Sequence, residues 1–101
     1  MEAVHHLNID IETYSDVDIK KAGLYRYAQS PAFNVLLIAY SLDGGPVEVI
    51  DLASGGPGSL IPVWFTNALK DPKCIKHAYN AAFEWYCLCR FFRWNPLREG
   101  L

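Results

Sequence analysis

The chain has 101 residues, of which 51% are hydrophobic and 20% are charged, which is enough apolar material for one small core and excludes a disordered segment. Its formal net charge is −2, and it shows no obvious basic patch of the kind by which dedicated nucleic-acid-binding domains grip phosphates. Its apolar runs are too short to cross a bilayer and no signal peptide is visible, so we expect one domain over residues 1–101 that does not enter a membrane.

The first predicted element is a strand over residues 4–12, where apolar and polar positions alternate. Ser15, followed three positions later by Asp18, resembles a helix capping box and predicts a short helical turn that ends near Gly23. The aromatic residues that follow, up to Ser30-Pro31, are expected to form a compact connection.

A hairpin is predicted next. Residues 33–42 are rich in β-forming side chains and predict a buried central strand, while residues 46–52 form the return strand. The Asp-Gly-Gly sequence between the two strands is typical of a tight hairpin turn. The first half of the chain is therefore expected to be a three-stranded antiparallel meander.

The second half predicts helix, strand and helix. Ser59 can cap a helix over residues 60–70, which carries an apolar stripe and ends at an Asp-Pro pair. Residues 74–79 form a fourth strand, and residues 81–93 form a helix that is apolar nearly all round and should be well buried. A strand reached through a helical crossover is usually parallel to its neighbour, so we expect the fourth strand to lie beside the first and parallel to it.

Two acids, Asp10 and Glu12, stand two positions apart on the first strand and therefore share one face, with Cα atoms about 6.5 Å apart. Paired carboxylates repel each other, and bound Mg²⁺ or Mn²⁺ removes that conflict. A solvated polar strand face is the alternative, and the spacing alone favours it.

A second pair, Asn80 and Glu84, shares one face at the start of the second helix. Asn is a favoured helix cap and an acid in the first turn complements the helix dipole, so a structural role would suffice. With the fourth strand parallel to the first, however, Glu84 projects toward Asp10 and Glu12. Three convergent carboxylates would indicate a cation site.

Other polar residues give weaker signals. Asp16 and Asp18 are expected to serve the capping turn, and Asp51 to lie at a strand end. The three histidines are weak candidate ligands: His5, His6 and His77. The three cysteines form no metal-ligand pattern and are expected to be buried, reduced thiols: Cys74, Cys87 and Cys89.

The acidic motifs carry a family resemblance. The stretch IDIET, residues 9–13, resembles the first motif of the DEDD-type 3′→5′ exonucleases, and YNAAFE, residues 79–84, resembles their second motif, which often reads His-Asn-x-x-Phe-Asp. Residues 10–45 are similar to the start of family A DNA polymerases, the polymerase I-like class, as carried by phages and prophages. The resemblance extends over residues 7–94 and implies the N-terminal part of the exonuclease domain of such a polymerase.

The resemblance also implies a fold and a site. The fold is α/β and ribonuclease H-like, a three-stranded antiparallel meander followed by α-β-α, with sheet order 3-2-1-4 and a fifth strand missing. Asp10 would bridge two divalent cations, Mg²⁺ or Mn²⁺, while Glu12 would bind one of them and Glu84 would be the acid of the second motif. Thr13 would lie near the 3′-terminal nucleotide, and Asn80 would contact the substrate.

The implied reaction is two-metal hydrolysis at the 3′ end of single-stranded DNA, as proofreading in the cytoplasm of a bacterial host cell. Tyr79 stands where the family usually has His, and Glu84 where it usually has Asp. The third exonuclease motif and the polymerase motifs are absent, so we expect this fragment to act with the remainder of the polymerase chain and to be inactive alone. An open sheet edge also predicts self-association of the fragment.

Two other functions stay open. The chain could be a non-catalytic ribonuclease H-like module with a structural or nucleic-acid-binding role, in which Tyr79 and Glu84 mark decay of the site. It could also be a stand-alone 3′→5′ exoribonuclease of the same superfamily, which the resemblance of residues 23–33 to polymerases disfavours.

Overall fold

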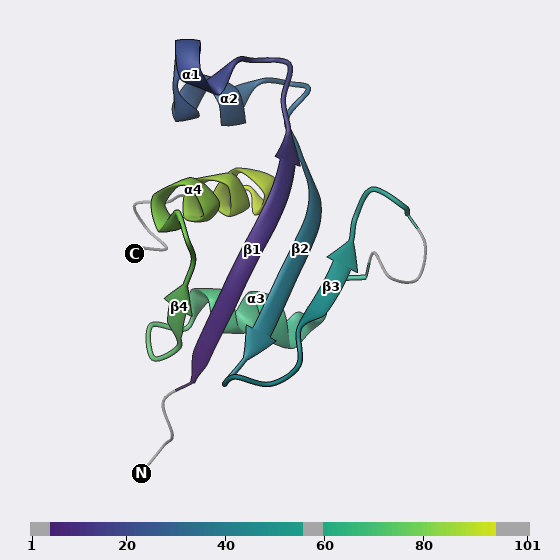
Figure 1. The fold of residues 1–101 in the computed structure, drawn as a ribbon, viewed down its shortest axis with the longest axis vertical. Helices are drawn as coiled ribbons and strands as arrows, with labels where there is room; N and C mark the ends of the chain where they lie inside the picture. The colour runs from purple at the N-terminus through teal and green to yellow at the C-terminus, as the bar shows by residue number, and fades with distance from the viewer. Residues whose placement is uncertain (1–4, 56–59, 95–101) are drawn as a thin grey trace.

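The computed structural model describes residues 5–55 and 60–94 (Figure 1). The elements are β1 (His6–Tyr14), α1 (Ile19–Ala22), α2 (Leu24–Gln29), β2 (Asn34–Leu42), β3 (Glu48–Asp51), α3 (Val63–Lys70), β4 (Ile75–His77) and α4 (Ala81–Phe92). The sheet has the order β3-β2-β1-β4, in which β1 is antiparallel to β2 and parallel to β4. This confirms the predicted order and is compatible with a ribonuclease H-like architecture.

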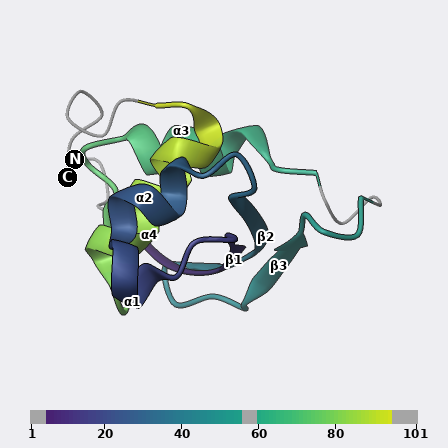
Figure 2. The same ribbon diagram turned by 90° about the horizontal axis from the view of Figure 1, so that it is seen from above.

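The sheet has one face turned toward the helices. Figure 2 shows α3 and α4 on the same side of the sheet. Alternate residues of β1 point into this layer, and the core is formed by buried side chains from the sheet and both helices: Leu7, Ile9, Ile11, Ile38, Phe65, Leu69, Trp85 and Leu88. The strand period therefore leaves Asn8, Asp10 and Glu12 on the other face, where they are exposed.

The hairpin turn between β2 and β3 has the predicted geometry. Asp43 and Gly44 both have positive φ angles, 54° and 73°, and the amide of Gly45 donates to the carbonyl of Leu42 at 2.9 Å. These are the features of a type I′ turn, whose twist matches that of the flanking strands. The Asp43 carboxylate also accepts the backbone N–H of His6 at 2.7 Å, so the turn is fixed to the start of β1.

The predicted capping box after β1 is wrong, although the helical turn exists and ends at Gly23. Asp18 is the N-cap of α1, and its side chain accepts from the amide of Lys20 at 2.9 Å. The Ser15 hydroxyl instead donates to the carbonyl of Tyr27 at 2.8 Å, which joins the end of β1 to α2. Asp16 does not cap the helix either, because its carboxylate accepts from the Ser30 hydroxyl.

The aromatic segment predicted as a connection forms the helix α2. Ala28 is fully buried, and the Tyr27 ring contacts Phe33 and Phe83 with centroids 5.9 Å and 6.2 Å away. A helix of six residues is too short to show a clear period and is not stable in isolation. Packing against α4 therefore stabilises it, and that contact was invisible in the local sequence.

The helices on either side of β4 differ in how well they were predicted. α3 begins at Val63 after Pro62, rather than at residue 60, and it ends at Lys70 as expected, with Asp71 as its C-cap. The predicted cap Ser59 lies outside the described residues. α4 matches its prediction, since Asn80 caps it by accepting from the amide of Phe83 at 3.3 Å. Within residues 5–55 and 60–94, no helix has the length and apolar character needed to cross a membrane.

The outer edge of β4 is expected to mediate self-association of the chain. The amide of Ile75 donates to the carbonyl of His5 at 2.8 Å, so the backbone of Lys76 points away from β1. We expect the apparent mass of the purified chain to rise with concentration in light scattering, because this edge can pair with a second chain. A strict monomer at all concentrations would contradict this prediction.

Candidate active site

The site is built where β1 extends beyond β4. β4 pairs only with residues 6–8 of β1, and its last pair joins His77 to Asn8. The following part of β1 therefore has no strand partner from β4 on that side. The carboxylate Oε1 of Glu84 accepts the backbone N–H of Ile11 at 3.3 Å. A side chain of α4 thus accepts the β1 amide hydrogen that the short strand β4 leaves without a strand partner.

Glu84 is a buried acid in an unfavourable environment for a charge. Glu84 is only 5% exposed, and its Oε2 atom has no hydrogen-bond partner among the described residues. Burial raises the pKa of Glu84, the hydrogen bond from the Ile11 amide lowers it, and the nearby charge of Asp10 raises it further. Asp10 and Glu84 therefore lie close together at the edge of β1, where the charge of Asp10 disfavours a second charge on Glu84.

Asp10 and Glu12 lie on the exposed face of β1, opposite Ala39 and Leu37 of β2. The pairing register shifts directly after Glu12, between it and Thr13. Such bulges bend a strand locally and often lie beside active sites, where they change the direction of a side chain. β1 continues to Tyr14, so Glu12 is not the last residue of the strand as we had expected.

The structure brings Asp10 and Glu84 together, while the predicted cation site itself stays a prediction. In the part of the chain that the structure describes, no group of three or more His, Cys, Asp or Glu side chains is arranged to hold a metal ion. The two neighbouring carboxyl groups nevertheless fit a hard cation, since Oε2 of Glu84 has no hydrogen-bond partner in the described part of the chain and carboxylate oxygens are preferred ligands of Mg²⁺ and Mn²⁺.

The two predicted substrate residues have structural partners. The Thr13 hydroxyl lies 2.8 Å from the Tyr27 hydroxyl, which ties the end of β1 to α2. The Asn80 side chain caps α4 and is exposed. Their predicted contacts with a substrate remain untested.

A groove beside Asp10 includes Tyr79 in its lining, and the sequence alone did not predict this groove. A groove of about 440 Å³ on the exposed face of the sheet is lined by residues that include Asn8, Asp10, His77 and Tyr79. Tyr79 itself is fully exposed. The parallel pairing of β4 with β1 was the signal that could have placed these residues beside the acid.

The histidines lie toward the start of β1, where their side chains contact one another and the hairpin turn. The Nδ1 atom of His6 lies 2.9 Å from the Nε2 atom of His77, and the two rings stack. The Nδ1 atom of His5 lies 2.7 Å from the Asp43 carboxylate, whose hydrogen bond raises the pKa of His5. These residues therefore tie together the hairpin turn and the starts of β1 and β4.

The cysteines have the predicted state, since Cys74, Cys87 and Cys89 are all buried thiols that form no disulfide. Burial raises the pKa of Cys87 to about 12, which keeps it protonated at neutral pH. It is therefore unsuited to act as a nucleophile.

Comparison with known proteins adds an independent observation. The chain is similar to a phage DNA polymerase. It is 49% identical over 86 residues to the DNA polymerase of Bacillus phage SP02, a match that covers 85% of this chain and 13% of that protein. The chain thus spans a small part of the length of this curated relative. No family profile matches the chain, and no solved structure matches it.

Glu84 predicts a pH dependence of stability in EDTA, without divalent cations. Because its pKa is higher in the folded chain, the folded state binds more protons than the unfolded state above the ordinary value of 4.5. The free energy of unfolding contributed by Glu84 therefore falls as the pH rises through the window that begins there. The Gln side chain of Glu84→Gln cannot ionise. In urea titrations from pH 4.5 to pH 8, the free energy of unfolding of this variant should therefore rise relative to that of the wild type. A constant difference would show that Glu84 does not titrate abnormally.

Proposed function

We propose that this chain is the first part of the 3′→5′ proofreading exonuclease domain of a phage-type, family A DNA polymerase. The observation that carries the proposal is the meeting of Glu84, from α4, with Asp10, on β1, at the edge of the sheet. The similarity to a phage DNA polymerase supports the polymerase context. The substrate would be the 3′ end of single-stranded DNA, and the remainder of a polymerase chain would complete the domain in the cytoplasm of a bacterial host cell.

In this proposal Asp10, Glu12 and Glu84 would hold two divalent cations, Mg²⁺ or Mn²⁺. When bound, such cations lower the pKa of the attacking water and stabilise the leaving 3′-oxygen of a phosphodiester. The Ile11 amide fixes Oε1 of Glu84 and leaves Oε2 for a cation. The buried Glu84 carboxyl would then give up its proton, because a nearby cation stabilises the charged form.

Neighbouring residues would orient the DNA end. The shift in register after Glu12 places Thr13 at the bend of β1, and its hydroxyl is held by Tyr27 at 2.8 Å. Asn80 keeps the first turn of α4 in place through its bond to the Phe83 amide. These two residues would contact the terminal nucleotide.

A non-catalytic module is the second candidate, and one observation favours it. Among the described residues, no three side chains of Asp, Glu, His or Cys lie close enough together to hold a metal ion. Such a module would keep the fold and the Asp10–Glu84 contact while lacking hydrolysis. A stand-alone exoribonuclease would instead keep hydrolysis and act on RNA ends.

The deciding experiment uses the full-length protein encoded by the gene that carries this chain. A single-stranded DNA labelled at its 5′ end should be shortened stepwise from its 3′ end with Mg²⁺ or Mn²⁺, and should stay intact in EDTA. Binding of DNA without shortening in either metal would favour the module. Shortening of an RNA strand alone would favour the exoribonuclease.

The 101-residue chain by itself is expected to be inactive. In this proposal Asp10, Glu12 and Glu84 are only part of the ligand set that the family resemblance implies, so catalysis that depends on two held cations would be lost. The same labelled strand, incubated with the purified chain and Mn²⁺, should remain full length when the full-length protein at equal concentration degrades it. Cation-dependent trimming by the chain alone would contradict this prediction.

A further inference from the structure

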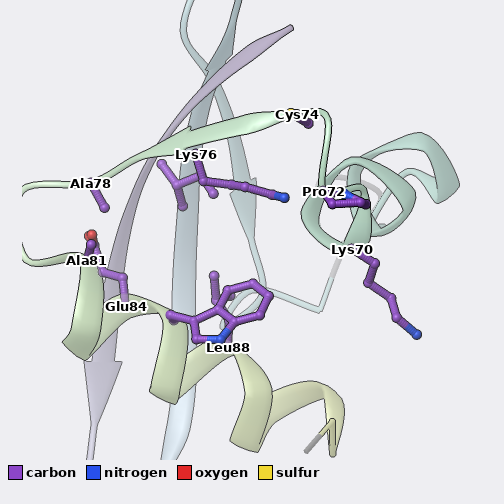
Figure 3. A pocket seen from close by; sticks show the side chains of 10 residues that line it. Lys70, Pro72, Cys74, Lys76, Ala78, Ala81, Glu84 and Leu88 are labelled. Carbon is purple, nitrogen blue, oxygen red and sulfur yellow. The ribbon is translucent and has the colours of Figure 1, made fainter. Parts of the chain in front are cut away.

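A cavity of about 430 Å³ lies between β4, α3 and α4, on the helix side of the sheet (Figure 3). Its volume is within the range of small-molecule sites, about 300–1,000 Å³. The walls are largely apolar and are formed by Ile9, Pro72, Cys74, Ala78, Ala81 and Leu88. None of the predicted functional residues except Glu84 lines this cavity, so it is distinct from the exposed face that carries Asp10 and Glu12.

Two of the lining residues carry buried polar atoms that have no partner. Glu84 and Trp85 are 5% and 7% exposed, and neither Oε2 of Glu84 nor Nε1 of Trp85 has a hydrogen-bond partner in the described part of the chain. Buried polar atoms nearly always have a partner in native proteins, so this pair requires an explanation. A ligand that satisfies both needs an acceptor for the indole N–H and a polar group for the carboxyl.

Positive charge lines the same cavity. Lys70 and Lys76 both contribute to its lining, and Figure 3 shows Lys70 on the side away from Glu84, with the Lys76 side chain extending in that direction. The Lys76 ammonium donates to the carbonyl of Asp71 at 2.6 Å. An ammonium group has three donors, so this bond leaves donors of Lys76 for an anion. The cavity is thus polar at its Glu84 end and cationic at Lys76, whereas the Lys70 ammonium lies over the Trp94 ring, 5.0 Å from its centroid.

We propose that this cavity binds a nucleoside monophosphate, with the base against Trp85 and the phosphate toward Lys76. A nucleobase combines apolar faces, which stack on aromatic rings, with an edge that carries donors and acceptors. The inference rests on the proposed function, since hydrolysis of a terminal phosphodiester releases a nucleoside monophosphate. Glu84 belongs to both sites, so the cavity would receive this product directly behind the carboxylates.

The test is calorimetric titration of the 101-residue chain in EDTA with deoxyadenosine 5′-monophosphate. Deoxyadenosine and inorganic phosphate, titrated separately, report the base and phosphate contributions. We expect the nucleotide to bind at least about tenfold more tightly than either part, because the cavity would contact both ends. Failure of the nucleotide to bind, or equal affinity for deoxyadenosine, would overturn the proposal.

Three variants locate the binding. Lys76→Gln should weaken nucleotide binding about tenfold and leave deoxyadenosine binding unchanged, since it removes a charged phosphate contact. Trp85→Phe keeps an aromatic ring but loses the N–H, and should weaken binding of both. Lys21→Gln, on the distant helix α1, is the matched control and should bind as the wild type does.

Unchanged nucleotide affinity in Lys76→Gln would refute this location, and that variant decides the matter if Trp85→Phe does not fold. Binding in EDTA is independent of cation-dependent hydrolysis. Nucleotide binding by the chain, together with a full-length protein that lacks exonuclease activity, would reject the proposed function alone. Exonuclease activity without nucleotide binding by the chain would reject the cavity alone.

Discussion

Asp10→Asn in the full-length protein is expected to reduce 3′→5′ excision of single-stranded DNA by at least about a hundredfold, a typical loss when transition-state charge stabilisation is removed. Asn has nearly the same shape as Asp but no negative charge, so it should bind a divalent cation poorly. It would also remove the charge that faces the buried Glu84 carboxyl. Release of labelled nucleotides from a 3′-labelled strand, at saturating Mg²⁺, measures the effect.

A matched acid controls for general damage. Asp51 ends β3 in the same sheet and accepts from the Ser54 amide at 3.2 Å, away from Asp10 and Glu84. Asp51→Asn keeps an acceptor there and should leave excision within about twofold of the wild type, as most surface substitutions cost under 0.5 kcal/mol. Polymerisation, if the full-length protein performs it, should be retained in both variants. Wild-type excision by Asp10→Asn would refute the proposed role of this residue.

Phe65→Ala should cause the largest loss of stability, about 3–5 kcal/mol, as is typical when a buried aromatic ring is removed from a core. The Phe65 side chain is fully buried, and its ring centroid lies 5.0 Å from that of Tyr40 on β2. The substitution leaves a cavity between α3 and the sheet that the surrounding side chains cannot fill. Because small domains are stabilised by only about 5–15 kcal/mol, much of the chain should be close to unfolding. Urea denaturation followed by circular dichroism measures the change.

The control for this loss lies two residues away on the same helix. Val63 is 75% exposed, so Val63→Ala removes methyl groups that face solvent. Its free energy of unfolding should stay within about 0.5 kcal/mol of the wild type. Equal stabilities for the Phe65 and Val63 variants would show that α3 does not pack on the sheet as described.

Local sequence patterns predicted the sheet well, because strand period and turn chemistry act between near neighbours. Alternation in β1 placed Asp10 and Glu12 on one face, and the structure has them there. The Asp-Gly-Gly turn forced positive φ angles at Asp43 and Gly44. The crossover through α3 predicted that β4 is parallel to β1, and the observed register confirms it.

Helix starts and the cap after β1 were predicted less well. Ser15 had the right spacing for a cap, but its hydroxyl bonds to Tyr27, twelve residues away. α2 was missed because its stability comes from packing on α4, as the contact of Tyr27 with Phe83 shows. Both errors have one cause, since side chains distant in sequence competed with the local signal.

The sequence by itself determined the acids of β1, their shared face and the parallel strand that leads to Glu84. Only the tertiary structure decided that Glu84 is buried, meets Asp10 and caps the Ile11 amide, because β4 ends level with Asn8 and leaves that edge of β1 open. The length of β4 depends on its packing against a segment some seventy residues away in the chain, and a local sequence pattern contains no information about such packing. The same packing encloses the cavity between β4 and the helices, where Oε2 of Glu84 and Nε1 of Trp85 have no hydrogen-bond partner among residues 5–55 and 60–94.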